Sequence, residues 1–219
     1  GTFSRAVSEA SEPMAHTLRR TRRFALATAL ALVPFAAEAH LVSTRFGELY
    51  SGLLHPLTTL LHLVPWACLG LLAGLQRAET SRWVPLAFPL AVVAGLVFSL
   101  AGSESHIVTT VNVLSFVVLG GAVALAIELP RWGFLALVAL FGITHGFANA
   151  APGVTGYDFV LYATGLGLAA YLWVTLVSGG AFALAKDFRW GTPALRALGS
   201  WVAAAGTIYL ALLTLGTSG

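Results

Sequence analysis

The chain has 219 residues, of which 58% are hydrophobic and 10% are charged, and its formal net charge is +3. Because soluble proteins carry about 25% charged residues, this composition indicates an integral membrane protein. The cationic residues are scattered at the ends of apolar segments instead of forming one face, which argues against a nucleic-acid partner.

The N-terminal region has the composition of a secretory signal peptide. Residues 1–13 precede Met14 and are interpreted as an upstream segment. After Met14 come four arginines, a short apolar stretch and an Ala-Glu-Ala sequence, which are the three parts of a signal peptide. We expect the signal peptide to span residues 14–39 and to be cleaved after Ala39. The alternative is an uncleaved first transmembrane helix.

The rest of the chain consists of apolar segments separated by short polar breaks, and each segment is long enough to cross a bilayer. No long linker interrupts them, so we expect a single domain over residues 40–219. The predicted fold is an all-α membrane protein, a polytopic bundle of about six transmembrane helices. These helices are expected near residues 50–75, 83–101, 107–127, 132–149, 157–180 and 197–216.

The distribution of cationic residues predicts the orientation of this bundle. If His40 begins the mature chain outside, the connections alternate between the two sides, and the outer side carries Arg45 alone. The inner side then carries Arg77, Arg82, Arg131, Lys186, Arg189 and Arg196. This asymmetry follows the positive-inside rule. We therefore expect a multi-pass protein of the bacterial inner (cytoplasmic) membrane with its mature N-terminus outside.

Two histidines, His55 and His62, lie inside the first apolar segment. Titratable side chains are costly in a bilayer, so such a pair is a functional-site hypothesis. Seven residues are close to two helical turns, which places both on one face about 10 Å apart along the axis. That separation is awkward for binding one ion. Pro56 and Pro65 could kink the helix and bring the rings closer, or the two histidines could belong to successive sites.

Other potential metal ligands gather on the expected outer side of the membrane. They are His40, His106, His145, Glu48, Glu104 and Asp158. Imidazole and carboxylate groups suit divalent first-row ions such as nickel, cobalt or zinc, and cleavage after Ala39 would give His40 an α-amine beside its imidazole. Glu48 and Asp158 are expected to be solvated loop charges. A histidine in an apolar helix is also commonly a hydrogen-bonded packing residue.

The stretch His55-Pro-Leu-Thr-Thr-Leu-Leu-His62 resembles the H-P-x-x-x-x-D-H pattern in the first helix of the HupE/UreJ family. This family of membrane proteins is regarded as nickel or cobalt permeases associated with hydrogenase and urease. The Ala39-His40 junction and the stretches at residues 103–107 and 141–149 are similar to further elements of the family. Leu61 stands where the family has Asp, and Asn149 where it has a second histidine.

The resemblance implies a permease or uptake facilitator for a divalent transition metal, Ni²⁺ or Co²⁺. The residues expected to bind the metal are His55, His62, His145, Glu104 and His40. Besides lipid and the metal, the implied partners are metalloenzyme maturation proteins or a larger membrane complex. The alternative is a non-transporting accessory or structural subunit that retains the fold, because Leu61 and Asn149 remove two ligands. We predict neither catalytic residues nor a resident cofactor: the chain has no G-x-S-x-G motif and no nucleotide-binding loop.

Overall fold

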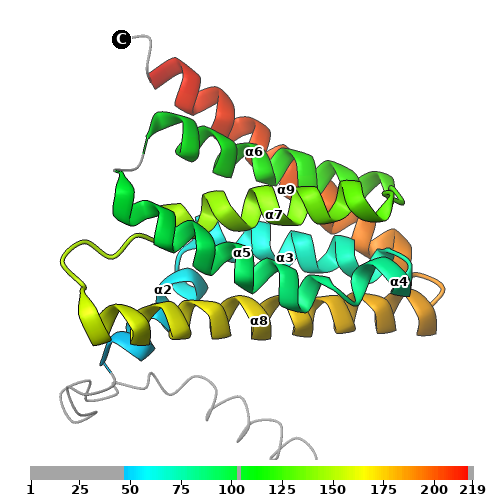
Figure 1. Cartoon of the computed structure of the whole chain (residues 1–219). Coiled ribbons are helices and arrows are strands. Elements are labelled where there is room, and N and C mark those ends of the chain that lie inside the picture. Colours follow the sequence, from blue (N-terminus) through cyan, green and yellow to red (C-terminus); the bar gives the residue numbers. More distant parts are fainter. Residues whose placement is uncertain (1–46, 103–104, 217–219) are drawn as a thin grey trace, which may run out of the picture. The chain divides into compact units, whose positions relative to one another are not determined.

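The computed structural model describes residues 47–102 and 105–216, and these residues form helices without any strand. The expected signal peptide, His40 and Glu104 lie outside the described residues. The elements are α2 (Gly47–Thr58), α3 (Leu60–Leu75), α4 (Ala78–Ser81), α5 (Val84–Phe98), the 3-10 turn η1 (Ser99–Ala101), α6 (His106–Leu125), α7 (Arg131–Ala148), α8 (Gly156–Asp187) and α9 (Gly191–Gly216) (Figure 1).

Within the described residues, five helical segments are long and apolar enough to cross a membrane, and α2 with α3 supplies a sixth if the bent pair is one span. The other five are the segment Ala78–Ala101 and the helices α6, α7, α8 and α9. This confirms the predicted all-α bundle of about six transmembrane helices. The bounds differ most in α8, which continues to Asp187, and in α9, which already begins at Gly191.

The first predicted helix is broken at Thr59, and its two parts meet at an angle of 75°. Pro56 lies near the end of α2, where its ring removes one backbone donor and crowds the preceding turn. Thr59 then adopts an extended conformation, with φ −96° and ψ 108°. Its carbonyl oxygen accepts hydrogen bonds from the backbone N–H groups of His62 and Leu63, both at 2.9 Å, and so begins α3.

The most extensive helix contacts are those of α2 and α3 with α8, of α5 with α7, and of α6 with α9. Glycine permits the closest crossings, because small residues let helix backbones approach in a membrane. A Cβ atom on Gly146 of α7 would collide with the carbonyl oxygen of Val92 in α5, and one on Gly52 of α2 would collide with that of Tyr162 in α8. The α5–α7 pair is therefore held at fixed spacing just where α7 carries His145.

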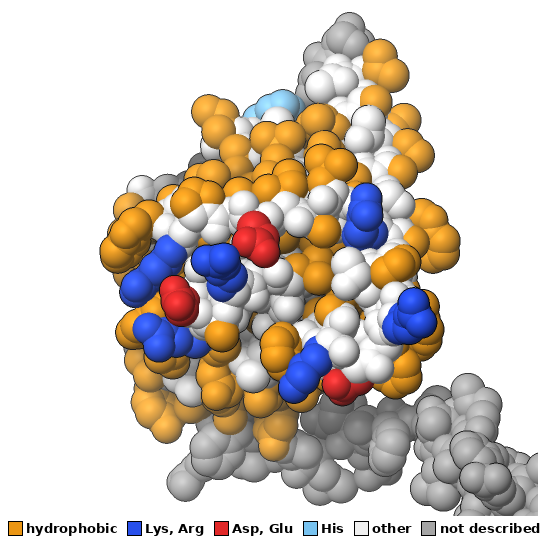
Figure 2. Space-filling model, turned by 90° about the vertical axis from the view of Figure 1, so that its right-hand side faces the viewer, with side chains coloured by type: hydrophobic (Ala, Val, Ile, Leu, Met, Phe, Trp, Pro, Cys, Tyr) orange, Lys and Arg blue, Asp and Glu red, His pale blue; other side chains and the backbone are white. Residues whose placement is uncertain are grey.

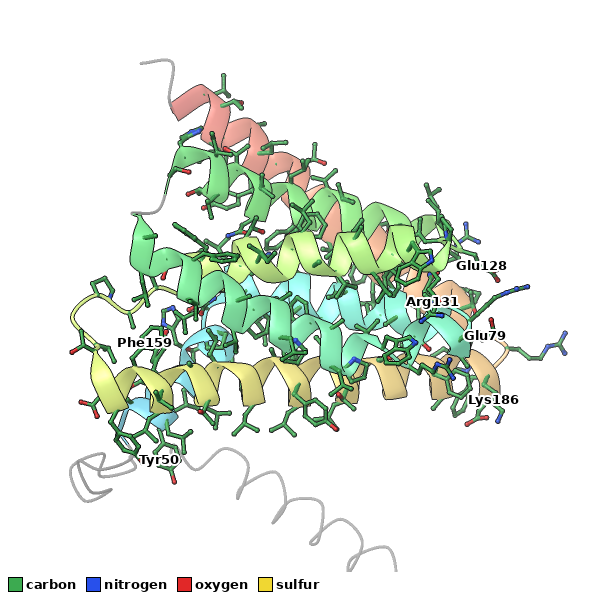
Figure 3. The ribbon with its side chains drawn as sticks, viewed as in Figure 1. Tyr50, Glu79, Glu128, Arg131, Phe159 and Lys186 are labelled. Carbon is green, nitrogen blue, oxygen red and sulfur yellow. The ribbon has the colours of Figure 1, made fainter. Side chains whose placement is uncertain are left out.

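The cationic residues of the described ranges lie at one end of the bundle, together with three acidic residues. Every Lys and Arg in the described ranges lies near α4, the α6–α7 connection or the α8–α9 connection, and these side chains gather on the face in Figure 2. The opposite end, marked by Tyr50 and Phe159 in Figure 3, carries Glu48 and Asp158 in the first turns of α2 and α8. The predicted alternation of cationic and non-cationic connections thus matches the arrangement of the helices.

Candidate cation site

Two buried histidines from different helices meet inside the bundle. His62 lies in the first turn of α3 and His145 in the last turn of α7. Their Nδ1 atoms are 2.9 Å apart and their ring centroids 5.2 Å apart. Only 6% of His62 and 0% of His145 is exposed. These two predicted site residues are therefore in direct contact, although 83 positions separate them in the chain.

The break at Thr59 brings His55 toward the same pair. The ring centroids of His55 and His62 lie 6.1 Å apart, whereas a straight helix would separate the two residues by about 10 Å along its axis. His55 is exposed, in contrast to His62. Of the two possibilities that the sequence left open, the structure thus favours a bend that draws the histidines together.

A cavity of about 220 Å³ adjoins His62 at this break. Its volume admits several water molecules. The lining residues are His55, Thr59, Leu61, His62, Thr109, Asn112, Val113 and Ala148. Leu61, which stands in the place of Asp in the H-P-x-x-x-x-D-H pattern, therefore lies on the cavity wall. Asn112 also offers an unused acceptor, since its Oδ1 atom is buried and has no hydrogen-bond partner among the described residues.

The spacing of the two Nδ1 atoms suits either a shared proton or a shared ion. Two nitrogen ligands at right angles around an ion, each about 2.1 Å from it, are separated by about 3.0 Å. Neutral imidazole nitrogens are ligands for nickel, cobalt and zinc. The described part of the chain contains no cluster of three or more His, Cys, Asp or Glu side chains that could hold a metal ion. An ion at this pair would need further oxygen ligands from backbone, amide, hydroxyl or water.

Behind His145 lies a network of buried polar groups. Its Nε2 atom is 3.0 Å from the Oγ atom of Ser115, a residue of α6 with no exposed surface. The Oγ atom of Ser115 donates to the carbonyl oxygen of Asn112 at 2.5 Å. On the other side, the Nδ2 atom of Asn149 donates to the backbone carbonyl oxygen of His145 at 2.7 Å. The hydroxyl of Tyr162 donates to the backbone carbonyl oxygen of Asn149 at 3.0 Å.

Sequence reasoning missed Ser115 and Asn112. A signal was present, because both are polar residues three positions apart in the otherwise apolar middle of α6, and buried polar groups in a membrane need partners. Asn149 was noted as a replacement of histidine that could still offer a neutral oxygen. In the structure it is fully buried and holds the end of α7.

The remaining predicted residues are not part of this cluster. His106 is exposed at the start of α6, where its Nδ1 atom lies 3.3 Å from the hydroxyl of Thr110. Glu48 and Asp158 were expected in loops, but they occupy the first turns of α2 and α8. That correction has a physical reason, since a carboxylate is favoured at the N-terminal end of a helix by its dipole.

The fold described above is that of a multi-pass α-helical membrane protein with a buried polar site at a broken helix. The model of the HupE / UreJ protein family matches residues 28–209. Protein HupE of Rhizobium leguminosarum bv. viciae is 30% identical over 175 residues, which cover 72% of this chain and 91% of that protein. The chain therefore belongs to the HupE/UreJ family, as its motifs predicted. No solved structure is significantly similar to it.

Proposed function

We propose that this protein is an integral membrane permease, or uptake facilitator, for Ni²⁺ or Co²⁺ that binds the ion between His62 and His145. The observation that carries this proposal is the contact of the two Nδ1 atoms at 2.9 Å beside a cavity at the break between α2 and α3. Broken membrane helices commonly form the substrate and ion sites of transporters. Intramembrane histidines are typical of ion pathways.

The charges of the bundle support a direction of transport. We propose that the end with Glu48 and Asp158 faces the outside and that the cationic end faces the cytoplasm of a bacterial inner membrane, following the positive-inside rule. The outer end would then attract divalent cations. The C-terminal end of α2 adds to this attraction, because the last carbonyl groups of a helix carry a partial negative charge. His40 and Glu104 would capture the ion outside, and His55 would pass it to His62.

A site of this composition suits transit better than storage. An ion held by two imidazoles, beside a cavity whose described lining contains no carboxylate, is released more easily than one in a charged cluster. Transport requires a site that the ion can leave. Leu61 on the cavity wall is the reason that the carboxylate is absent. The proposed site is thus a weaker version of the motif that the sequence resembles.

The second candidate is a non-transporting accessory subunit of a larger membrane complex. The observation that favours it is the same loss of ligands, since the described residues offer no group of three acidic, histidine or cysteine side chains that could hold a metal ion. In such a subunit the His62–His145 contact would serve only to join α3 and α7.

Metal accumulation by cells distinguishes these two functions. Cells that express the protein should accumulate more nickel or cobalt than cells with an empty vector, and His62→Ala should remove the difference. His106→Ala is the matched control, because it deletes an imidazole that lies outside the cavity lining. Equal accumulation in wild type, His62→Ala and empty-vector cells, at equal protein levels, would refute transport and favour the accessory subunit.

A further inference from the structure

In its contact with the carbonyl oxygen of Asn112, the hydroxyl group of Ser115 can only be the hydrogen-bond donor. Its Oγ atom lies 2.5 Å from the carbonyl oxygen of Asn112. Two oxygen atoms at this distance need a hydrogen between them, and a carbonyl has none to give. Serine in an apolar helix commonly donates in this way to a carbonyl of the preceding turn. The single hydroxyl proton of Ser115 is therefore used inside α6.

The Oγ atom of Ser115 can then act only as an acceptor toward His145. Because it lies 3.0 Å from Nε2 of His145, that nitrogen must carry a proton. His145 has no exposed surface, and a buried charge without an ionic partner is costly, so the imidazole is neutral and has one proton. Its Nδ1 atom is consequently left with a lone pair.

This lone pair lies on the side of the ring that meets His62, since the two Nδ1 atoms are 2.9 Å apart. Without an ion, the Nδ1–H group of His62 donates to it. An ion bound between the rings would require the proton of His62 to move from Nδ1 to Nε2, so that both Nδ1 atoms could serve as ligands. If the proton of His145 stood on Nδ1, that nitrogen could not bind a cation at all.

We propose that Ser115 is a positioning residue that fixes His145 in the form with a proton on Nε2 and so keeps its Nδ1 atom available to a divalent cation. This inference rests on the proposed function, because it assigns a role to Ser115 in cation binding. The direction of this hydrogen bond also differs from that in serine hydrolases. A serine nucleophile donates its proton to a histidine, whereas here the histidine donates to the serine.

The ¹⁵N chemical shifts of His145 test the inference directly in the purified full-length protein. In metal-free wild type, Nε2 should show the shift of a protonated nitrogen and Nδ1 that of an unprotonated one. Ser115→Ala should convert this pattern to a mixture of both forms. Ser115→Thr, which retains a hydroxyl able to bond within α6, should restore the wild-type pattern. The ¹⁵N signals of His145 are assigned as those that are missing from the spectrum of His145→Gln.

Titration with Co²⁺ alone supplies the second readout. Loss of a hydrogen-bond partner behind a metal ligand commonly lowers affinity 10- to 100-fold, so Ser115→Ala should weaken Co²⁺ binding by about 10-fold or more. Ser200→Ala is the matched control. It deletes a hydroxyl that donates to the carbonyl of Ala197 in α9 at 2.7 Å, and should leave the affinity unchanged.

The outcomes separate this inference from the proposed function. A proton on Nδ1 of His145 in wild type, or the same pattern in wild type and Ser115→Ala, would overturn the role of Ser115. If Ser115→Ala changes the pattern but neither protein binds Co²⁺ or Ni²⁺, the assignment of the proton is supported and the proposed function is refuted. A change of pattern with no change in Co²⁺ affinity would also overturn the positioning role.

Discussion

Replacing Leu61 by aspartate should strengthen cation binding, because Leu61 lines the same cavity as His55 and His62. Two unit charges 4 Å apart attract one another by about 4 kcal/mol at an effective dielectric constant of about 20, and a divalent ion doubles this value. Removing charges from water costs several kcal/mol per ion. Because Leu61 lines a cavity large enough for several water molecules, water beside the new carboxylate would reduce this cost.

The expected net gain is about 1.4 to 2.8 kcal/mol, which corresponds to about 10- to 100-fold tighter binding. Isothermal titration of the purified protein with Co²⁺ and with Ni²⁺ measures this gain. The control is Leu61→Asn, which has nearly the same shape as Leu61→Asp but no charge. If Leu61→Asp binds no more tightly than Leu61→Asn, the cation does not bind close to Leu61 and the reasoning fails.

Two further predictions concern topology and packing. In intact cells, a cysteine introduced at Asp158 should react with a membrane-impermeant thiol reagent, and one introduced at Arg82 should not. The native Cys68 is buried and should not react. The reverse pattern would refute the proposed orientation. Gly146→Ala should lower the free energy of unfolding by about 1–3 kcal/mol, because its methyl group would meet the carbonyl of Val92. Thermal unfolding in detergent should show no such loss for Gly121→Ala, whose Cβ would meet no described atom within 4 Å. Equal stability of the two variants would contradict the close α5–α7 packing.

The spans were predictable because a bilayer imposes a minimum apolar length on each helix, and the sequence keeps its charges at the ends of such segments. The exact residues at which the spans begin and end were harder to predict. The fifth span was expected to end near residue 180, but α8 continues through Gly179 and Gly180 to Asp187. Unpaired backbone groups in hydrocarbon cost several kcal/mol each, whereas glycine costs a helix only about 1 kcal/mol. The helix therefore continues through both glycines.

The broken first helix was only partly predictable. Pro56 indicates a kink, but apolar residues continue on both sides of Thr59 and nothing in their pattern gives the 75° angle. The angle depends on how α2 and α3 each pack against α8, which is a tertiary property. The approach of His55 to His62 follows from that angle and was accordingly left open.

The residues of the candidate site were also predictable only in part. His62 and His145 stand out in the sequence because imidazoles are rare and costly in apolar helices. Ser115 is a weaker signal than these histidines, since a serine costs little in such a helix when it bonds to its own backbone. Its contact with His145 depends on how α6 packs against α7. Residue spacing within one helix cannot reveal a partner on another.

X-ray absorption spectroscopy of the Co²⁺-loaded, purified protein tests the central claim most directly, because it measures the imidazole ligands of the bound ion. If the ion lies between His62 and His145, the wild-type spectrum should require at least two imidazole ligands, and His62→Ala should remove one of them while His106→Ala removes none. A spectrum without imidazole scattering, or one that His62→Ala leaves unchanged, would contradict the claim that this histidine pair binds the cation.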